Sequence, residues 1–275
     1  MTAEDFVFGF DRAIAVHHEG QGRVSADLDA GWSTPAGLNG GYIAAVLLNA
    51  VIAAVGRPER HPRSLTLHYL STPKPGPAAV EVTVERSGRT LTSVSARLVQ
   101  DGRTRVIALA ALGGPYDRDV SFDTPAVELT PFGELEPLDW IPPGFPIVEF
   151  FDLRPSLGPM PFVEPPADEA VTGGWIRLRD ERPLDAPALA MYADAWWPAA
   201  FVRMPVPVPV PTVDLTIHFR APEVLAALEP GSPVKVRFTT RTAHDGYFEE
   251  DGELWAPDGT LLANSRQLAI LPPQP

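Results

Sequence analysis

Apolar and polar residues alternate in the same way in two short segments that lie more than half the chain apart. The first segment is Leu65–Tyr69, with the sequence LTLHY, and the second is Leu215–Phe219, with the sequence LTIHF. Alternation with a period of two is typical of a strand that buries one face. The two segments therefore predict equivalent strands of an internal repeat, with each residue of the second copy 150 positions after its counterpart in the first (Leu215 against Leu65).

The segments that follow each copy extend the repeat. In both halves a strand-like run comes next, then an Asp-Gly pair, and then an apolar strand. Asp-Gly between alternating residues is a strong signal of a tight hairpin, so each half predicts antiparallel strands. The runs are Val80–Val84 and Val234–Phe238, the turns are Asp101-Gly102 and Asp258-Gly259, and the closing strands are Ile107–Leu112 and Leu261–Leu271.

An apolar segment of helical length precedes each copy. The first, Gly40–Val55, has Asn39 as its expected N-cap, and its body is apolar on every side. Such a helix must be wrapped by other elements. The second, Asp185–Arg203, carries Asp194 in the middle of its apolar run. A helix followed by antiparallel strands, twice in the same order, predicts a duplicated α+β unit.

The remaining pattern divides the chain into two units and a linker. We expect an N-terminal unit over 1–113, a Pro/Gly-rich linker over 114–146, and a C-terminal unit over 147–275 that carries the chemistry. Proline alternates through Pro205–Pro211, which predicts an extended connector before the strand at Thr212. Short strands are also expected at Phe6–Phe10 and Val24–Leu28, and further segments of the second unit at Ile147–Leu153 and Val171–Leu178.

Composition narrows the function. The net charge is −13 and no block of Lys or Arg stands out, which argues against binding to nucleic acid or to an anionic membrane surface. The chain has no cysteine, so disulfides and thiolate sites are excluded, and its histidines lack metal-ligand spacing. The most apolar stretch, Gly41–Val55, is too short to span a bilayer, and the acidic N-terminus has no apolar signal segment. We expect a cytoplasmic protein without a metal or other cofactor.

Several motifs occur in the order seen in one known family, and the likeness covers nearly the whole chain. With them the chain resembles the double hot-dog acyl-CoA thioesterases, the type II (TesB-like) family. The resemblance implies a double hot-dog fold, in which each unit wraps a curved antiparallel sheet around a long apolar helix. The motifs are Gly37–Val46, Leu65–Leu70 running into Ser71–Gly76, Arg86–Arg97, Gly174–Arg179 and Met191–Asp194.

The resemblance also implies a site. The family holds and activates a water molecule with an Asp, a Thr and a Gln from the second half, which correspond here to Asp194, Thr212 and Gln267. Thr216 has the same strand parity as Thr212 and is the alternative hydroxyl. The backbone N–H of Gly41, at the glycine-rich start of the first helix, is the expected oxyanion donor. Gly40 and Trp196 are the expected substrate-binding residues, and the Trp196-Trp197 pair replaces an Asn-containing apolar stretch of the family, which bears on acyl-chain selectivity.

These residue types suit thioester hydrolysis. A carboxylate takes a proton from water, while a hydroxyl and a carboxamide fix where the water sits. The repeat offers an internal comparison, because Pro62 stands where the second copy has Thr212, Gln267 falls near Leu112, and the first helix has no acid. Residues needed only for the fold tend to be kept in both copies. The difference therefore points to one site, built on the second copy.

The expected function is an acyl-CoA thioesterase of lipid metabolism that releases a free acid and CoA, assembled as a homodimer. Two alternatives stay open. One is a non-catalytic protein that binds acyl-CoA or acyl groups, in which Asp194 is a structural acid paired with Arg203. The other is a hot-dog hydratase or dehydratase, in which His218 acts with Asp214.

Overall fold

The computed structural model describes residues 8–20, 23–115, 120, 122–139 and 144–272. In the first half the elements are α1 (Gly9–Ala13), β1 (Val16–Gly20), β2 (Arg23–Leu28), the 3-10 helix η1 (Ala30–Trp32), β3 (Ser33–Thr34), β4 (Gly37–Leu38), α2 (Gly40–Val55), β5 (His61–Tyr69), β6 (Gly76–Ser87), β7 (Leu91–Gln100) and β8 (Arg103–Gly113). In the second half they are η2 (Phe132–Glu134), η3 (Pro146–Phe150), β9 (Phe151–Leu157), β10 (Ala170–Leu178), α3 (Ala186–Tyr192), η4 (Ala199–Arg203), β11 (Thr212–Phe219), α4 (Pro222–Ala227), β12 (Val234–Thr240), β13 (Ala243–His244), β14 (Tyr247–Trp255) and β15 (Leu261–Ile270).

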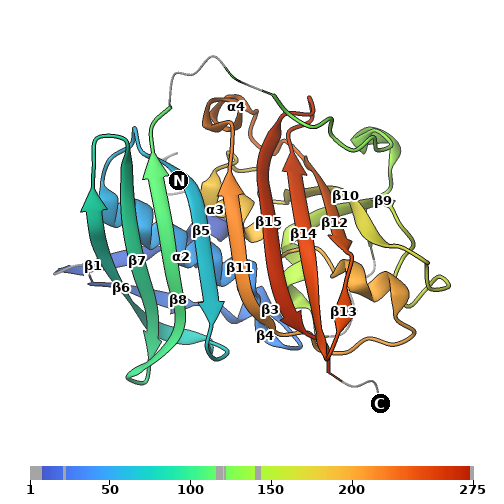
Figure 1. Ribbon diagram of the computed structural model, residues 1–275, viewed down its shortest axis with the longest axis horizontal. Coiled ribbons are helices and arrows are strands. Elements are labelled where there is room, and N and C mark those ends of the chain that lie inside the picture. Colours follow the sequence, from blue (N-terminus) through green and yellow to red (C-terminus); the bar gives the residue numbers. More distant parts are fainter. Residues whose placement is uncertain (1–7, 21–22, 116–119, 121, 140–143, 273–275) are drawn as a thin grey trace, which may run out of the picture.

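Within the described ranges, thirteen strands form one antiparallel sheet, and β3 and β4 form a separate pair. The order across the sheet is β1-β2-β6-β7-β8-β5-β11-β15-β14-β12-β10-β9, with β13 paired to β14. The six strands of each half follow the same order outward from the middle, so the predicted duplication is confirmed. Figure 1 shows the two halves side by side, joined through β5 and β11.

The two repeat-related strands are neighbours at the centre of the sheet. β5 and β11 pair antiparallel, with Thr66 opposite Thr216 and Leu65 opposite Ile217. The hydroxyls of Thr216 and Thr66 lie 3.1 Å apart and share a hydrogen bond. Because Thr66 and Thr216 occupy the same place in the repeat, an approximate two-fold axis passes between them. Each end of this strand pair is therefore the counterpart of the other end.

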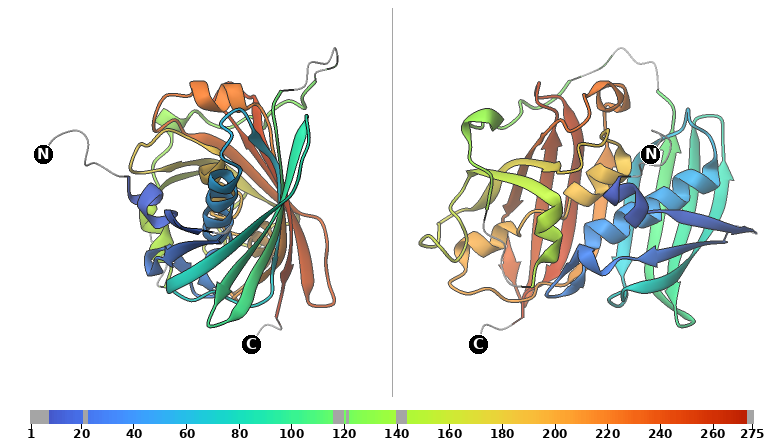
Figure 2. Two further views of the ribbon diagram at one scale, coloured as in Figure 1. Left: turned by 90° about the vertical axis from the view of Figure 1, so that its left-hand side faces the viewer. Right: turned by 180° about the vertical axis from the view of Figure 1, so that it is seen from behind.

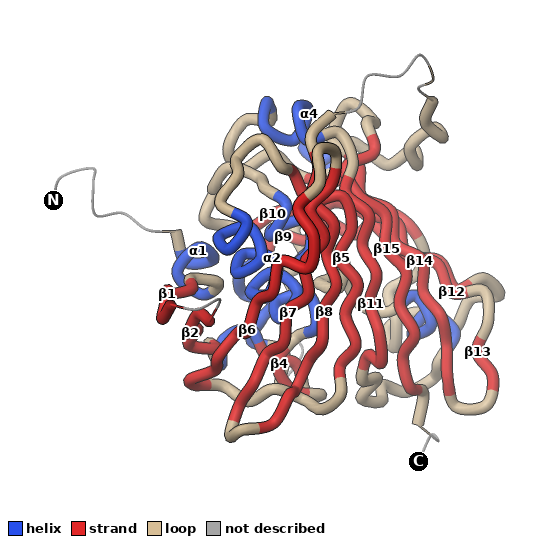
Figure 3. The backbone as a smooth tube through the Cα atoms, turned by 60° about the vertical axis from the view of Figure 1, so that its left-hand side comes forward, coloured by secondary structure: helices blue, strands red, loops and turns tan. Residues whose placement is uncertain are grey.

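The long first helix lies in the concave side of the sheet, as Figures 2 and 3 show. α2 begins at Gly40 behind the N-cap Asn39, whose side chain accepts a hydrogen bond from the Tyr42 N–H, and it ends at Gly56 in the left-handed conformation. Its residues from Gly41 to Leu48 are all buried. The apolar core around this helix continues without a break into α3 and the inner face of the second half of the sheet.

The prediction of one long second helix was wrong. α3 ends at Tyr192, a turn follows, and η4 begins only at Ala199. Pro198 excludes one continuous helix through this segment, because it has no N–H to donate to the Asp194 carbonyl four residues earlier and it disfavours the helical conformation at Trp197. Asp194 is consequently not inside a helix. It lies two residues beyond the end of α3, in the turn.

The strand predicted at Phe6–Phe10 was also wrong where it can be compared. Gly9 and Phe10 belong to α1, while residues 6 and 7 lie outside the described ranges. The carboxylate of Asp180, from the second half, accepts a hydrogen bond from the Phe10 N–H, which favours a helical start at this point. Phe10 then packs its ring edge-on against Trp32, with ring centroids 5.3 Å apart.

A matching irregularity occurs where β5 and β11 begin. The register of β5 with β8 shifts between Pro62 and Ser64, and the register of β11 with β15 shifts between Thr212 and Asp214. Each shift leaves one residue unpaired, Arg63 in the first copy and Val213 in the second. A bulge of this kind reverses which face the preceding side chain points to. The repeat thus carries the same bulge twice, and in the second copy it controls the direction of Thr212.

None of the helices in the described part of the chain is both long and apolar enough to cross a bilayer.

Candidate active site

Asp194 joins the end of α3 to the start of α2. Its backbone N–H donates to the carbonyl of Met191 at 3.2 Å, which closes the turn after α3. This turn aims the carboxylate at the first turn of α2. There Oδ2 of Asp194 accepts hydrogen bonds from the Gly41 N–H at 2.9 Å and from Asn39 Nδ2 at 3.1 Å. A carboxylate at a helix N-terminus is favoured by the unpaired N–H groups and the helix dipole.

Asn39 has two tasks at this point. Its Oδ1 accepts from the Tyr42 N–H at 2.9 Å and caps α2, while its Nδ2 donates to the Asp194 carboxylate and, at 2.7 Å, to the Asp194 carbonyl. The residue predicted only as an N-cap therefore also fixes the predicted catalytic acid. The contacts described for Asp194 come from Asn39, Gly40, Gly41 and Gln267, and they do not include the Arg203 partner considered for it.

Gly40 and Gly41 allow α2 to approach the turn this closely. A Cβ on Gly41 would lie 2.6 Å from the carbonyl oxygen of Met191 and 3.0 Å from Cβ of Asp194. A Cβ on Gly40 would lie 2.9 Å from Oδ2 of Asp194 and 3.2 Å from the hydroxyl of Tyr69. Any side chain at either position would push Asp194 away from the helix start.

The environment makes Asp194 a weaker acid. Burial raises the pKa of its carboxyl group to about 6, against the opposing effect of the hydrogen bonds from the Gly41 N–H and the Gln267 side chain. Part of Asp194 nevertheless stays exposed to solvent. With a pKa near 6, the Asp194 carboxylate is largely ionised at neutral pH and basic enough to accept a proton from water.

Thr212 and Gln267 meet on the same inner face of the sheet. Thr212 Oγ1 donates to Gln267 Oε1 at 3.1 Å. The bulge at Val213 makes this contact possible, because it pairs Thr212 with Ala269, a buried residue with the same strand parity as Gln267. Thr216, the alternative hydroxyl, instead bonds Thr66 across the centre of the sheet. Of the two threonines considered for the site, Thr212 is thus the one that contacts Gln267.

The other end of the Gln267 amide faces two carboxylates. Its Nε2 donates to Glu250 Oε1 at 2.8 Å, and the side chain also stabilises the ionised form of Asp194 through a hydrogen bond. Glu250 is 4% exposed, and its second carboxylate oxygen accepts from the Ala199 N–H at the start of η4. Burial, and next to it the charge of Asp194, raise the pKa of Glu250 to about 7. Glu250 was not among the site residues predicted from the sequence, although it shares strand parity with the buried Phe248 and Leu254.

Tyr69 is a second residue beside the site that was not predicted from the sequence. Its hydroxyl donates to the carbonyl of Gly40 at 2.7 Å, beside the Asp194 carboxylate. Burial, together with the charge of Asp194, raises its pKa well above the usual value. The signal for Tyr69 was in the repeat itself, since the second copy has Phe219, without a hydroxyl, at the equivalent position.

The opposite end of the central strand pair lacks these polar groups. Ala110 is the counterpart of Gln267, because Ala110 pairs with Leu65 and Gln267 pairs with Leu215. Val94 is the counterpart of Glu250, because Val94 pairs with Ala110 and Glu250 pairs with Gln267. Pro62 replaces Thr212 in the same way. The register thus sharpens the earlier alignment of Gln267 near Leu112. One end of the molecule gathers carboxylates, amides and hydroxyls, and the equivalent strand positions at the other end hold the apolar residues Pro62, Ala110 and Val94.

Other candidate residues lie apart from this group. Trp196 is buried in the core, where its indole N–H donates to Thr172 Oγ1 at 3.1 Å, and its substrate-binding role stays a prediction. His218 is exposed on the face of β11 opposite the buried Leu215 and Ile217, so it points away from Asp194. No cluster of His, Cys, Asp or Glu in the described ranges is arranged to hold a metal ion.

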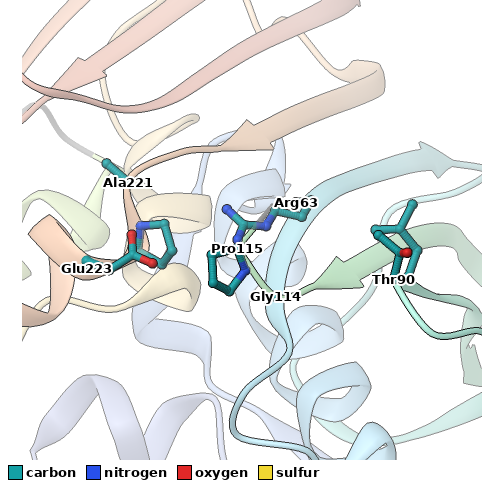
Figure 4. A pocket seen from close by; sticks show the side chains of 8 residues that line it. Arg63, Thr90, Gly114, Pro115, Ala221 and Glu223 are labelled. Carbon is teal, nitrogen blue, oxygen red and sulfur yellow. The ribbon is translucent and has the colours of Figure 1, made fainter. Parts of the chain in front are cut away.

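A pocket of about 440 Å³ lies at the opposite end of the strand pair from the predicted site and contains none of the predicted site residues. Arg63, the bulged residue of β5, stands between Glu223 on one side and Thr90 on the other, as Figure 4 shows. Its Nε donates to the carbonyl of Gly113 at 3.1 Å, which ties it to the end of β8. The remaining lining residues are Leu91, Gly114, Pro115, Ala221 and Pro222.

Comparison with known proteins agrees with this architecture. Residues 28–113 match the family model of the acyl-CoA thioesterase N-terminal domain, and residues 127–271 match that of the acyl-CoA thioesterase C-terminal domain. A conserved protein of unknown function with a hot-dog fold from Alicyclobacillus acidocaldarius superposes with a TM-score of 0.89 at 27% identity, covering 98% of this chain and 100% of that one.

Two further relatives are informative. A putative thioesterase II from Thermobifida fusca superposes with a TM-score of 0.82 at 28% identity, covering 96% of this chain and 98% of that one. An uncharacterised protein of Mycobacterium tuberculosis strain H37Rv is 26% identical, with 90% of each chain covered. The predicted α+β double hot-dog fold is thereby confirmed.

Proposed function

The chain belongs to the acyl-CoA thioesterase family and is a thioester hydrolase, and from this premise we propose that Asp194, Thr212 and Gln267 hydrolyse an acyl-CoA to a free acid and CoA through one activated water. The observation that carries the proposal is the connection of these three side chains. Thr212 donates to Gln267, and Gln267 in turn stabilises the carboxylate of Asp194. The apolar counterpart of the site, at the other end of the strand pair, supports a chemical rather than a structural purpose.

In the proposed reaction Asp194 is the general base. Its carboxylate takes a proton from the water as the water oxygen bonds to the thioester carbonyl carbon, and the carbonyl electron pair moves to the oxygen. When this intermediate collapses, the carbon–sulfur bond breaks and the thiolate receives the proton from Asp194. The pKa of about 6 suits both transfers, because the group accepts and returns a proton near neutral pH.

Thr212 and Gln267 hold the water in this scheme. The Thr212 hydroxyl oxygen keeps acceptor capacity after donating to Gln267, and the Gln267 amide approaches Asp194 from the strand side. Fixing the water between groups of this kind contributes through proximity and orientation.

The Gly41 N–H remains the proposed oxyanion donor. In the free protein it donates to Asp194 Oδ2, so it becomes available to a substrate only when that bond weakens. Proton transfer from water neutralises Asp194 at the moment when negative charge develops on the substrate oxygen. The neutral Asp194 carboxyl is then a weaker acceptor than the substrate oxygen, so the Gly41 N–H turns from Asp194 to the substrate. Gly40 is assigned to the same approach path, where a side chain would collide with Oδ2 of Asp194 and with the Tyr69 hydroxyl.

We propose an acyl-CoA as the substrate, and this is tested by direct assay. The homodimer and the cytoplasmic location stay predictions from the sequence. A panel of acyl-CoA esters differing in chain length, branching and aromatic content is offered to the purified protein, and the released thiol is recorded. Trp196 is proposed to shape which acyl groups are accepted, since it follows Asp194 by two residues.

The decisive variant is Asp194→Asn, which keeps the size and the acceptor oxygen of the side chain but removes the base. Loss of a general base lowers kcat by about 10²-fold to 10⁴-fold. Turnover by the folded Asp194→Asn protein at the wild-type rate refutes the assignment of the base. An unmodified protein that releases no thiol from any member of the panel refutes the proposed function as a whole.

A further inference from the structure

We propose that Glu250 is a positioning residue for thioester hydrolysis, which holds the Gln267 amide in the one orientation that presents its oxygen to Thr212 and its N–H groups to the carboxylates. This inference rests on the proposed function and adds a residue to its site. No part of the sequence pattern that led to Asp194, Thr212 and Gln267 pointed to Glu250.

The orientation of the Gln267 amide has two possible solutions, and its neighbours select one. With Oε1 toward Thr212 Oγ1 at 3.1 Å, Nε2 lies toward Glu250 Oε1 at 2.8 Å and has a second hydrogen for Asp194. In the flipped orientation, the amide oxygen would face both carboxylates. Thr212 does not decide between the two, because a hydroxyl donates or accepts with equal ease. Glu250, which only accepts when ionised, does decide.

A carboxylate is required at position 250, because both of its oxygens are approached by donors. The Ala199 N–H points at one oxygen and Gln267 Nε2 at the other. A carboxylate accepts at both, whereas an amide or a protonated carboxyl accepts at one and donates at the other. An amide or a protonated carboxyl at position 250 would therefore set its own donor against the Ala199 N–H or against Gln267 Nε2, unless the Gln267 amide flips.

The fold itself does not call for a charge at this place. Glu250 is almost fully buried, and in the repeat the apolar Val94 occupies the equivalent position. Burying an ionised carboxylate is costly unless it is paired. The charges that raise the pKa of Glu250 are those of two other acids, Asp194 and Glu249. The interactions described for Asp194 likewise include no cation. An unneutralised acid beside the catalytic acid is best explained by its effect on Gln267.

The same contacts link Glu250 to pH. Asp194 is faced by Asn39 at the N-cap of α2, by Gly40 and Gly41 in its first turn, by Tyr69 from β5 and by Gln267 from β15. Glu250 is faced by Ala199, by Gln267 and by the charge of Asp194, with Glu249 on its own strand. Two carboxyls that share one amide titrate as a pair. With pKa values of about 6 and about 7, both must lose their protons before the site is in its working form. The acid limb of the pH profile then depends on two protons in the wild type.

The test compares Glu250→Gln with Glu253→Gln. Glu253 lies on the same strand but on the outer face, where it pairs with Arg237, so its variant is the matched control. For Glu250→Gln we expect kcat to fall about 10-fold to 100-fold through misplacement of Gln267, with KM within about 3-fold of the wild type. We also expect the acid limb of log kcat against pH to lose one of its two protons, with the control unchanged in both respects.

A folded Glu250→Gln protein that keeps the wild-type kcat, or whose acid limb keeps its slope, overturns the inference. Should that variant fail to fold, the exchange Glu250→Gln with Gln267→Glu preserves bonding partners for Ala199 and Thr212 but leaves Asp194 without its amide donor. We expect the exchanged protein to fold and to be inactive. Activity in the folded exchange variant also overturns the inference.

Failure of the proposed function is distinguishable from failure of this inference. If the wild type hydrolyses no acyl-CoA, carboxyl ¹³C NMR of labelled Asp and Glu still follows the two acids without turnover. Coupled titration of Asp194 and Glu250 in the wild type, replaced by a single step for Asp194 in Glu250→Gln, supports their connection through Gln267. Independent titration of the two acids refutes it.

Discussion

Replacing Gly41 by alanine tests whether the close approach of α2 to Asp194 creates the site. The added Cβ would lie 2.6 Å from the Met191 carbonyl oxygen, whereas an ordinary contact begins near 3.4 Å. The neighbours must therefore separate by about 0.8 Å, or the helix must shift by that amount. Because the atom in the way belongs to the backbone of α3, it does not rotate aside as a side chain does.

Two opposing effects set the size of the change. Overpacking of this kind costs about 1–3 kcal/mol, while alanine gains up to ~1 kcal/mol over glycine in a helix. The net loss of up to about 2 kcal/mol corresponds to a fall in Tm of up to roughly 4 °C for a chain of this size. A displacement near 1 Å in a catalytic group costs about 10²-fold in rate, so kcat should fall by a comparable factor.

Thermal unfolding followed by circular dichroism and thiol release from an acyl-CoA give the two readouts. Gly133→Ala is the matched control, since a Cβ there has no heavy atom within 4 Å. We expect the control to match the wild type in both measurements. If Gly41→Ala also matches the wild type, with Tm unchanged and kcat within about 2-fold, the steric argument for this glycine is wrong.

Three further outcomes follow from the same contacts. Thr212→Val removes the donor to Gln267 at constant shape, so kcat should fall about 10-fold, while Thr212→Ser should stay within a few-fold of the wild type. Tyr69→Phe removes the hydrogen bond to the Gly40 carbonyl and should lower stability by about 1 kcal/mol and reduce kcat without misfolding, since the repeat already has phenylalanine at this position. Asp194→Asn should raise Tm at pH 8, with a gain that shrinks toward pH 4. Burial raises the folded pKa of this acid to about 6, so the folded protein holds the proton more tightly than the unfolded chain, and ionisation as the pH rises destabilises the fold.

The sequence predicted the repeated architecture because the signals involved are local and occur twice. Alternation in β5 and β11, the Asn39 cap and the apolar body of α2 each needed only a few neighbouring residues. The long second helix failed for a local reason as well, since Pro198 outweighs the apolar composition around it. The position of Asp194 in a turn, where its carboxylate meets another helix, follows from that break.

The polar site was only partly predictable, because several of its features depend on register. Thr212 and Thr216 share strand parity in the sequence, and only the unpaired Val213 separates their directions. Glu250 stands in a run of acids that resembles a solvated edge, and its burial depends on which face of β14 the core covers. The pairing of β14 with β15, rather than composition, places Glu250 opposite Gln267.

Covalent fusion of two hot-dog units has a lasting evolutionary effect on this chain. Asn39 and Gly41 of the first unit donate to Asp194 of the second, and Tyr69 holds the Gly40 carbonyl beside it, while Pro62 and Ala110 stand at the other end in place of Thr212 and Gln267. Once ancestral twins specialise in this complementary way, neither gene segment encodes an autonomous catalyst. Separation of the halves into independent polypeptides would leave each without part of the proposed site, and building a second site at the other end would require several substitutions at once.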